Sequence, residues 1–338
     1  MLEESTVGQS LVINDPAAPT RAERLALALA GAAGAALTAG GVAFYRRPLA
    51  TLRAYLRLRL LLSGVVERTV DVDGLPLRYF EAGPRAGRAN GGTLVLIHGL
   101  GDAAETWARV LPALARDYRT LAPDLAGFGR TPIPPEGMRF SVLTGYLARF
   151  LDAVAPEPVA LVGNSLGGAV AMRYVAARPD RVRHLFLLNS AGWPGEIPPA
   201  LEPTTCELAR ELAEIAGGKP YRRLPRFILD DLIRRAQDPA RRAYLASPER
   251  TDVSADLPRI TVPTTLIWGE RDRLFPFGNA GRLRDAIRGA ELIVLPEVGH
   301  GPQAEAPREV VAIIRERLRM PAGAAPPPPE GRRSVVES

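Results

Sequence analysis

The residues best suited to chemistry lie in the stretch Gly163-Asn164-Ser165-Leu166-Gly167, which follows a short apolar run. This stretch matches G-x-S-x-G, a pattern that places a serine in a sharp turn between a strand and a helix. A serine hydroxyl is a weak nucleophile unless a base activates it and hydrogen-bond donors stabilise the oxyanion. The sequence therefore predicts Ser165 as a nucleophile and the backbone N–H of Leu166 as one oxyanion donor.

The general base has to be one of only three histidines. His184 begins an apolar segment and is interpreted as structural. His98 follows an apolar strand and is expected to shape the loop in which Leu100 supplies the second oxyanion N–H. His300 lies between the last predicted strand and the last predicted helix, at the same edge of the sheet as Ser165. Elimination and position make His300 the predicted base.

An acid must orient that histidine, and the segment WGERDRLFP offers Glu270 and Asp272. Asp272 lies two residues further into the loop and is freer to turn towards His300, so it is the predicted acid. Glu270 is expected to face a neighbouring helix instead. Asp124 ends another strand, where a carboxylate is expected to cap the following loop. No Cys/His cluster has metal-ligand spacing, and neither a metal nor a cofactor is predicted.

Short apolar segments alternate with amphipathic ones through the body of the chain, which predicts a mostly parallel sheet with helices on both faces. Strands are expected at 67–74, 75–83, 93–99, 118–124, 158–163, 181–189, 264–270 and 290–297, and helices at 104–116, 140–154, 165–179, 277–287 and 307–319. Between residues 193 and 262 the pattern changes to three helical segments, 204–217, 225–236 and 238–246. This insertion predicts a helical cap over the strand ends, where ligands bind in open α/β sheets. The core is then formed by residues 66–192 and 263–319.

An uncharged apolar stretch precedes this body at residues 25–45, after a polar leader at 1–24. As a helix it would reach about 30 Å, the thickness of a bilayer core. It is interpreted as a single-pass membrane anchor, with a cleaved signal peptide (and hence secretion) or a loose helix as the alternatives. The tail at 320–338 is rich in proline and is expected to be disordered.

Residues 46–63 contain no acidic side chain and predict a basic amphipathic helix against anionic headgroups. Their arginines are Arg46, Arg47, Arg53, Arg57 and Arg59. Because these outnumber the two arginines that precede the apolar stretch, the positive-inside rule places the following domain on the cytoplasmic side.

The chain carries a formal net charge of +6. Its arginines are scattered along helices beside acidic residues and do not gather with aromatic side chains, which argues against nucleic-acid binding. The predicted partners are a lipid or small ester substrate and a membrane surface, and no protein partner can be inferred.

Several motifs resemble those of the α/β-hydrolase superfamily: HGLGD, DLAGFGRT, GNSLGG, WGERDRLFP and the final VGHG. The resemblance covers roughly residues 66–319, and the order Ser165, Asp272, His300 is the one that this fold uses. A serine at the nucleophile position disfavours the dehalogenase and epoxide-hydrolase branches, which use aspartate. The apolar N-terminal stretch before this core is similar to that of membrane-bound monoacylglycerol lipases.

The resemblance implies acyl transfer through Ser165, His300 and Asp272, with ester substrates. Two alternatives stay open: a hydrolase of carbon–carbon bonds or other small molecules tethered to the membrane, and a non-catalytic binding scaffold. The carbon–carbon hydrolases share GNSxGG and WGxxD but commonly have tryptophan directly after the histidine, where this chain has Gly301. That difference and the apolar stretch favour an ester substrate.

Overall fold

The protein is described by a computed structural model that covers residues 38–84, 91–195, 199–217, 224–249 and 251–320. The chain forms two compact units, residues 1–46 and 47–338. In the first unit, residues 38–46 are helical. Within the described ranges, no helix combines the length and the apolar character that a bilayer crossing requires. Most of the predicted anchor, the leader and nearly all of the tail lie outside the described residues.

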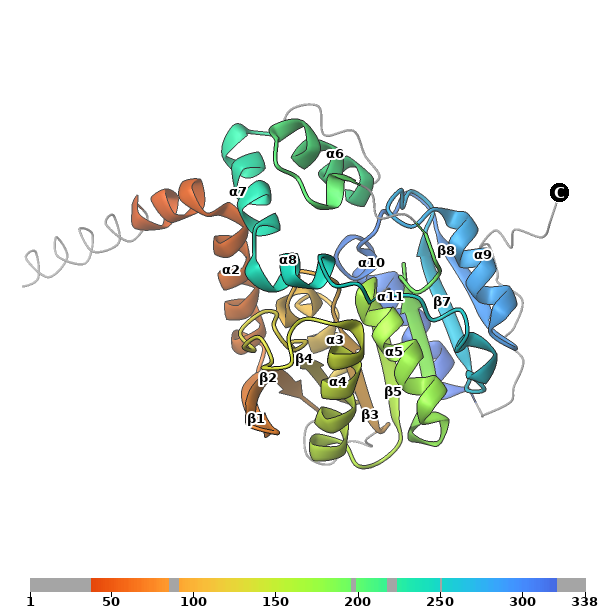
Figure 1. Ribbon diagram of the computed structural model, residues 1–338. Helices are drawn as coiled ribbons and strands as arrows, with labels where there is room; N and C mark the ends of the chain where they lie inside the picture. The colour runs from red at the N-terminus through yellow and green to blue at the C-terminus, as the bar shows by residue number, and fades with distance from the viewer. Residues whose placement is uncertain (1–37, 85–90, 196–198, 218–223, 250, 321–338) are drawn as a thin grey trace, which may run out of the picture. The chain divides into compact units, whose positions relative to one another are not determined.

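The second unit is built on an eight-stranded sheet with the order β1-β2-β4-β3-β5-β6-β7-β8 (Figure 1). Its strands are β1 (Val66–Val72), β2 (Leu75–Ala82), β3 (Thr93–Ile97), β4 (Arg119–Pro123), β5 (Val159–Asn164), β6 (Val182–Leu188), β7 (Thr264–Gly269) and β8 (Glu291–Leu295). Strand β2 runs antiparallel to β1 and β4, and the pairs from β4 to β8 are parallel. The carboxyl ends of β3, β5, β7 and β8 therefore meet at one edge, where the predicted site residues follow.

Helices cover both faces of this sheet, as the sequence predicts. The helices of the core are α2 (Pro48–Leu62), α3 (Leu111–Leu114), α4 (Phe140–Val154), α5 (Leu166–Ala177), α9 (Phe277–Ala286), α10 (Pro302–Glu305) and α11 (Pro307–Arg319). Side chains of α4, α5 and α9 join one apolar cluster, and those of α3 and α11 join another. Together with the sheet, the two clusters make the fold that of an α/β hydrolase.

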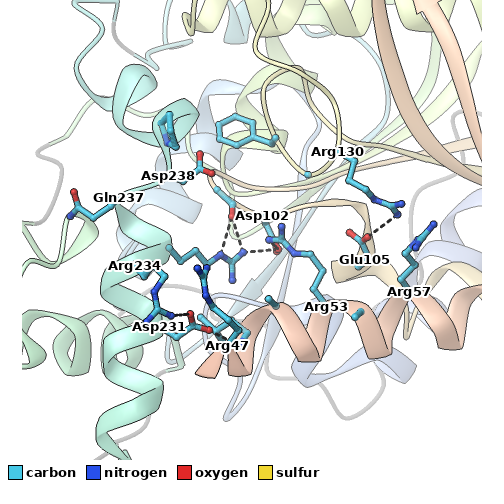
Figure 2. Close-up of a pocket in the computed structure, with 18 of the residues that line it drawn as sticks. Arg47, Arg53, Arg57, Asp102, Glu105, Arg130, Asp231, Arg234, Gln237 and Asp238 are labelled. Carbon is cyan, nitrogen blue, oxygen red and sulfur yellow. Dashed lines mark hydrogen bonds and ion pairs between the residues drawn. The ribbon is translucent and has the colours of Figure 1, made fainter. Parts of the chain in front are cut away.

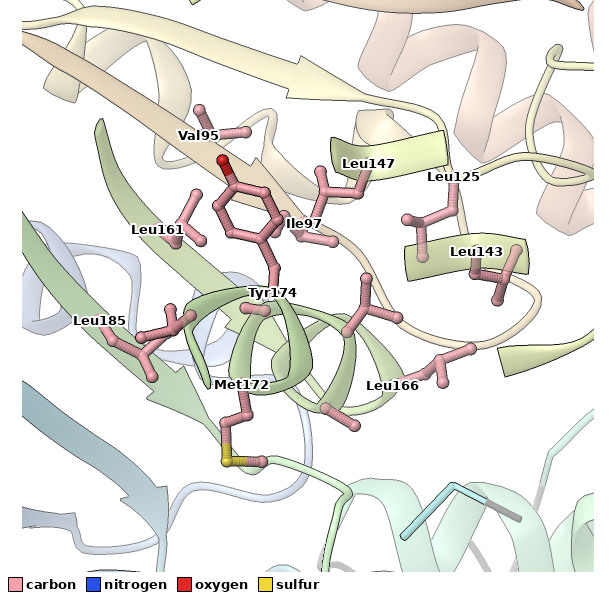
Figure 3. Packing of buried hydrophobic residues seen from close by; sticks show 14 of the residues in the cluster. Val95, Ile97, Leu125, Leu143, Leu147, Leu161, Leu166, Met172, Tyr174 and Leu185 are labelled. Atoms are coloured by element: carbon pink, nitrogen blue, oxygen red, sulfur yellow. The ribbon is translucent and has the colours of Figure 1, made fainter. Parts of the chain in front are cut away.

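Strand β3 contributes side chains to both apolar clusters, one on each face of the sheet. Val95 and Ile97 belong to the cluster of α4 and α5, while Leu94 and Leu96 belong to the opposite cluster. Successive side chains of a strand point to opposite faces, so a continuous apolar run is needed when both faces are covered. Figure 3 shows Ile97 packed with Leu161 of β5 in the first cluster. Truncating either side chain to alanine would cost about 2–5 kcal/mol of stability.

Three further helices lie between β6 and β7, and they match the predicted cap. They are α6 (Cys206–Gly217), α7 (Arg226–Ala236) and α8 (Pro239–Leu245). The C-terminal end of α6 lies over the sheet edge, because the carbonyl of Ile215 accepts a hydrogen bond from the N–H of Arg273, just after β7. The predicted helix at 104–116 is wrong as one element: a 3₁₀ turn (Ala104–Trp107) and α3 replace it, with Pro112 at the start of α3. Proline lacks an N–H and favours the first turn of a helix, not its interior.

Helix α2 differs from the expectation of a segment separate from the core. It belongs to the second unit, contacts α7 and the 3₁₀ turn, and fully buries Leu60 in the core. Arg57 pairs with Glu67 at 2.5 Å, and Arg53 lies 3.8 Å from Asp102. The helix is therefore anchored to the hydrolase core, and two of its arginines already face carboxylates of the same unit.

Candidate active site

Ser165 occupies a strained turn between β5, which ends at Asn164, and α5, which begins at Leu166. Its backbone angles are φ 55° and ψ −124°, outside the regions that most residues adopt. The turn is held by hydrogen bonds: Ser165 N donates to the Leu188 carbonyl at 3.1 Å, and Ser165 O accepts from Ala191 N at 3.0 Å. Strain of this kind persists only when the surroundings determine it, and it is common at active sites.

Two glycines of the motif allow the close approach that the turn requires. A Cβ at Gly163 would lie 2.5 Å from the Gly167 carbonyl oxygen, and a Cβ at Gly167 would lie 2.4 Å from the Ile97 carbonyl oxygen. Both contacts are with backbone, which cannot move aside as the end of a side chain can. The glycines therefore let α5 start directly against β5 and the end of β3.

Asp272 and His300 are brought together, as the sequence predicts. Asp272 Oδ2 lies 2.9 Å from His300 Nδ1, and the same oxygen accepts a 2.5 Å hydrogen bond from Asn189 Nδ2. The other oxygen accepts from the N–H groups of Leu274 and Phe275 at 2.8 and 3.1 Å. An ionised carboxylate only accepts, so in the neutral imidazole this contact places the proton on Nδ1 and the lone pair on Nε2.

Asn189 is a site residue that the sequence reasoning missed. Its amide donates to Asp272 Oδ2, while its carbonyl oxygen accepts from Gly269 N at 3.0 Å, so it links the ends of β6 and β7. Its φ of 41° is positive, a conformation that asparagine tolerates better than most residues. The available signal was a polar residue directly after an apolar strand at the edge that carries Ser165.

The loop of His300 is fixed against the residue that precedes the nucleophile. Asn164 Nδ2 donates to the carbonyl oxygens of His300 (3.2 Å) and Leu188 (3.0 Å), and Asn164 Oδ1 accepts from Gln303 (3.0 Å). In the part of the chain that the structure describes, no hydrogen bond joins the Ser165 hydroxyl to the His300 ring. Such a bond often tightens only when substrate binds, so the arrangement remains compatible with proton transfer.

Further contacts hold the histidine loop from both sides. Glu305 accepts hydrogen bonds from Gly299 N and Gly301 N at 3.0 and 3.1 Å. From the cap, the Ala216 carbonyl at the end of α6 accepts a 2.6 Å hydrogen bond from His300 N. The position of the imidazole therefore depends on the cap as well as on the core.

The two predicted oxyanion donors lie on loops that meet at Ser165. A Cβ on Gly99 would lie 3.0 Å from the Ser165 Cβ, so the segment preceding Leu100 packs directly against the serine. Among the described residues, neither the Leu100 N–H nor the Leu166 N–H has a hydrogen-bond acceptor. Helix α5 begins at Leu166, and N–H groups at a helix start favour negative charge. Both groups remain available to an oxyanion.

Comparison with known proteins agrees with this geometry. The model of the Alpha/beta hydrolase family matches residues 94–313. The chain belongs to the alpha/beta hydrolase family.

Relatives within the family differ in what their names say they act on. The chain is 30% identical over 263 residues to 2-hydroxy-6-oxo-6-(2'-aminophenyl)hexa-2,4-dienoic acid hydrolase of Metapseudomonas resinovorans, covering 73% of this chain and 89% of that protein. It is 30% identical over 242 residues to the pimeloyl-[acyl-carrier protein] methyl ester esterase of Aeromonas hydrophila, covering 66% of this chain and 94% of the esterase. The solved structure of a membrane phospholipase A aligns with a TM-score of 0.65 at 26% identity, covering 86% of this chain and 96% of that one.

The other two histidines of this alpha/beta hydrolase are buried and bonded within the fold, the surroundings expected of structural residues. His98 is fully buried; its Nδ1 lies 2.8 Å from the Gly99 carbonyl, and its Nε2 accepts from Leu125 N at 2.9 Å. Burial lowers the pKa of His98, against the opposing charges of nearby carboxylates. His184 lies inside the sheet on β6, 3.0 Å from the Thr265 hydroxyl, and burial lowers its pKa to about 4.

The remaining acidic candidates lie away from the imidazole. Asp124 accepts hydrogen bonds from Ala104 N and Arg130 N at 2.8 and 2.9 Å, so it joins two loops in the capping role that was expected. Glu270 is exposed. Asp272, by contrast, is the carboxylate that contacts His300. Among the described residues, no group of three or more His, Cys, Asp or Glu side chains is placed to hold a metal ion.

Proposed function

We propose that this hydrolase cleaves carboxylic esters through an acyl-enzyme on Ser165. The observation that carries the proposal is the hydrogen bond between Asp272 and His300 Nδ1, which leaves Nε2 unprotonated beside the strained serine turn. Because Asp272 has donors on both oxygens and a fully buried side chain, the orientation of the imidazole is set before substrate binds.

The proposed reaction uses only residues of this chain. His300 Nε2 accepts the Ser165 hydroxyl proton as Oγ bonds to the ester carbonyl carbon, and the N–H groups of Leu100 and Leu166 stabilise the oxyanion. The tetrahedral intermediate expels the alcohol, which takes the proton from His300. Water then attacks the acyl-enzyme by the same route and releases the acid and free Ser165.

We further propose that the substrate is a lipid ester, such as a monoacylglycerol, reached at a membrane. Helix α2 supports this proposal, since it exposes Tyr55, Leu58 and Leu62 with 54%, 53% and 78% of their areas accessible. Apolar side chains on an exposed helix face, with Arg59 among them, suit insertion at the lipid–water boundary. The similarity to a membrane phospholipase A, which extends over 86% of this chain, is consistent with the same proposal.

The first experiment asks whether Ser165 reacts. A fluorophosphonate probe should label the full-length protein and should fail to label Ser165→Ala. Labelling of neither protein would favour the scaffold alternative and reject the acyl-enzyme.

The second experiment asks which ester is used and where. A protein that begins at residue 47 keeps α2 but lacks the predicted anchor at 25–45. It should hydrolyse short p-nitrophenyl esters as the full chain does, but should lose activity on monoacylglycerols in vesicles. The truncation should end before α2. A longer deletion, of residues 1–63, would also remove Leu60, whose side chain is fully buried in the core. Leu58→Ser with Leu62→Ser should weaken binding to vesicles, and Ile133→Ser, an exposed apolar residue outside α2, is the matched control. Equal activity of the truncated and full-length proteins on vesicles would reject the role of the anchor, and unchanged vesicle binding of the Leu58→Ser, Leu62→Ser variant would reject the role of α2.

A second candidate activity is the hydrolysis of carbon–carbon bonds. It is favoured by the 30% identity to the dienoic acid hydrolase over 89% of that protein's length. The substrate panel should therefore include 2-hydroxy-6-oxo-dienoic acids. Turnover of these acids with no turnover of any ester would replace the ester proposal with this one.

A further inference from the structure

A cavity lies between α2 and α7, and neither Ser165, His300 nor Asp272 is among the described residues that line it. It has a volume of about 600 Å³ (Figure 2). Gly101 and Asp102, directly after the predicted oxyanion residue Leu100, form part of its wall, and Gly127–Arg130 contribute another part. The cavity plays no part in the chemistry proposed for Ser165.

Positive side chains outnumber negative ones around this cavity. Four carboxylates line it, from Asp102, Glu105, Asp231 and Asp238. Among the described residues, six guanidinium groups line it, from Arg47, Arg53, Arg57, Arg130, Arg234 and Arg235. Arg57 and Arg130 already pair with Glu67, which lies outside the cavity lining. A concave site with a surplus of fixed cations concentrates anions from solution.

Three of the four carboxylates are hydrogen-bonded by the protein; the fourth, Glu105, lies 3.5 Å from Arg130 and keeps one buried oxygen without a partner. Asp231 pairs with Arg234 at 2.5 Å and also accepts from Leu49 N at 2.8 Å. Asp238 accepts from Arg241 N at the start of α8. These acids therefore have little capacity left to neutralise further arginines.

Asp102 is shared between two arginines. Its Oδ1 lies 3.0 Å from Arg235 Nη2, which also donates to the Gly101 carbonyl at 2.7 Å, and 3.8 Å from Arg53 Nη2. The longer distance is an ion pair without a hydrogen bond. Arg53 thus keeps its donors available on the cavity side.

Arg47 has no side-chain hydrogen bond or ion pair with any residue that the structure describes. In Figure 2 it lies beside Asp231 and Arg234, on the same wall as Arg53. Arg47 immediately precedes α2 and Arg53 lies within it, and both line the cavity. Their guanidinium groups offer planar forks that match the oxygens of a phosphate.

We propose that this cavity binds a phosphate group, held by Arg47 and Arg53 between α2 and α7. The group is either a free phosphate monoester or the phosphodiester of a lipid headgroup. The site is independent of the ester chemistry, because none of its residues belongs to the Ser165, His300 and Asp272 set.

The test is titration calorimetry on full-length protein in low-chloride buffer, with inorganic phosphate and with glycerophosphoglycerol as separate ligands. We expect binding that weakens roughly tenfold or more in Arg47→Gln with Arg53→Gln, since charge-assisted hydrogen bonds are lost. Stronger binding of inorganic phosphate identifies a free phosphate, and stronger binding of the diester identifies a headgroup. Ser165→Ala should bind as the unchanged protein does, so failure of the ester proposal leaves this one intact.

Arg59→Gln is the matched control, because Arg59 is exposed on the same helix and does not line the cavity. The single variant Arg47→Gln is a second test in case the double variant does not fold. Arg47 has no side-chain partner among the described residues, so its substitution should leave the fold intact. The proposal is overturned if neither ligand binds, if the double variant binds as the unchanged protein does, or if Arg59→Gln weakens binding as much as the double variant.

Discussion

Two regions of the molecule use charge in opposite ways. One is the site of Ser165, His300 and Asp272, here called the serine corner; the other is the cavity lined by Arg47 and Arg53, here called the arginine cavity. At the serine corner, one carboxylate, Asp272, receives hydrogen bonds from Asn189, Leu274 and Phe275 as well as His300. At the cavity, six guanidinium groups meet four carboxylates. The protein itself supplies donors to both oxygens of Asp272, whereas the cavity has donors left for an anion from outside.

The two regions also differ in burial, which sets how strongly their charges act. The Asp272 side chain is fully buried, while the Arg53 side chain is 34% exposed. Charges in a water-excluded site interact strongly, whereas exposed ones are screened by solvent and salt. Substitutions at the corner should therefore strongly reduce turnover. Substitutions at the cavity should change the free energy of unfolding only slightly.

The largest effect is expected for Ser165→Ala. Because the three residues act as a unit, kcat on a short ester should fall by roughly 10⁴ to 10⁶. The thermal midpoint should change little, since alanine keeps the Cβ and the backbone hydrogen bonds that hold the turn. Initial-rate assays with p-nitrophenyl butyrate measure kcat, and a thermal melting curve measures the midpoint. Retained turnover would show that another residue is the nucleophile.

Asp272→Asn should follow, with kcat lower by about 10⁴ and KM little changed. An amide can donate to His300 Nδ1 and so favour the wrong tautomer. Glu270→Gln is the matched control, because Glu270 is two residues away and exposed. If Glu270→Gln were the more damaging change, the assignment of the acid would be wrong.

Asn189→Ala tests whether turnover depends on the hydrogen bond that Asn189 donates to Asp272. It removes one donor to Asp272 and the acceptor for Gly269 N, and kcat should fall roughly 10- to 100-fold from a loss of about 1–3 kcal/mol. KM should stay within a factor of two or so, since the residue acts through Asp272 and not on substrate. A purely structural role would instead lower the unfolding free energy and leave kcat of the folded fraction unchanged.

His184 shows what burial does to a titratable group without a counter-charge. Burial, and then Arg183 and Arg317, lower its pKa from 6.5 to about 4. A lowered histidine pKa means that the unfolded chain binds the proton first, so stability is full above pH ~6.5 and declines as the pH falls to ~4. The decline should reach on the order of 3 kcal/mol. His184→Gln should flatten this decline in urea unfolding at pH 7 and pH 4.5, and an unchanged slope would reject the assignment.

The smallest effect is expected for Arg47→Gln in phosphate-free buffer. Because the cavity carries surplus positive charge, removing one charge should leave the urea midpoint unchanged or slightly higher at low ionic strength. The difference should vanish at high salt, where repulsion is screened. A clear loss of stability at low salt would mean that Arg47 is neutralised within the protein and would weaken the contrast between the two regions.

Local pattern was enough to predict much of the fold. The helices expected at 140–154 and 307–319 match α4 and α11 to the residue, because amphipathic periodicity and flanking loops mark their ends. The prediction of one helix at 104–116 was wrong because a new short helix begins at Leu111, with Pro112 in its first turn. Residues 46–63 were read correctly as a helix, yet their apolar side chains could equally have faced a membrane or the core.

Sequence alone determined the position of Ser165 in a strand–turn–helix, since glycine spacing and apolar runs are local signals. It also narrowed the partners to His300 and Asp272, because the ends of parallel strands share one edge. Only the tertiary structure shows the hydrogen bond between Asp272 and His300 Nδ1, and that Asn189 supports Asp272. The same is true of the cavity, whose arginines come from α2, the loop after Gly127 and α7. The physical reason is distance along the chain: hydrogen bonds and ion pairs between residues far apart in sequence exist only once the sheet has set their strands side by side.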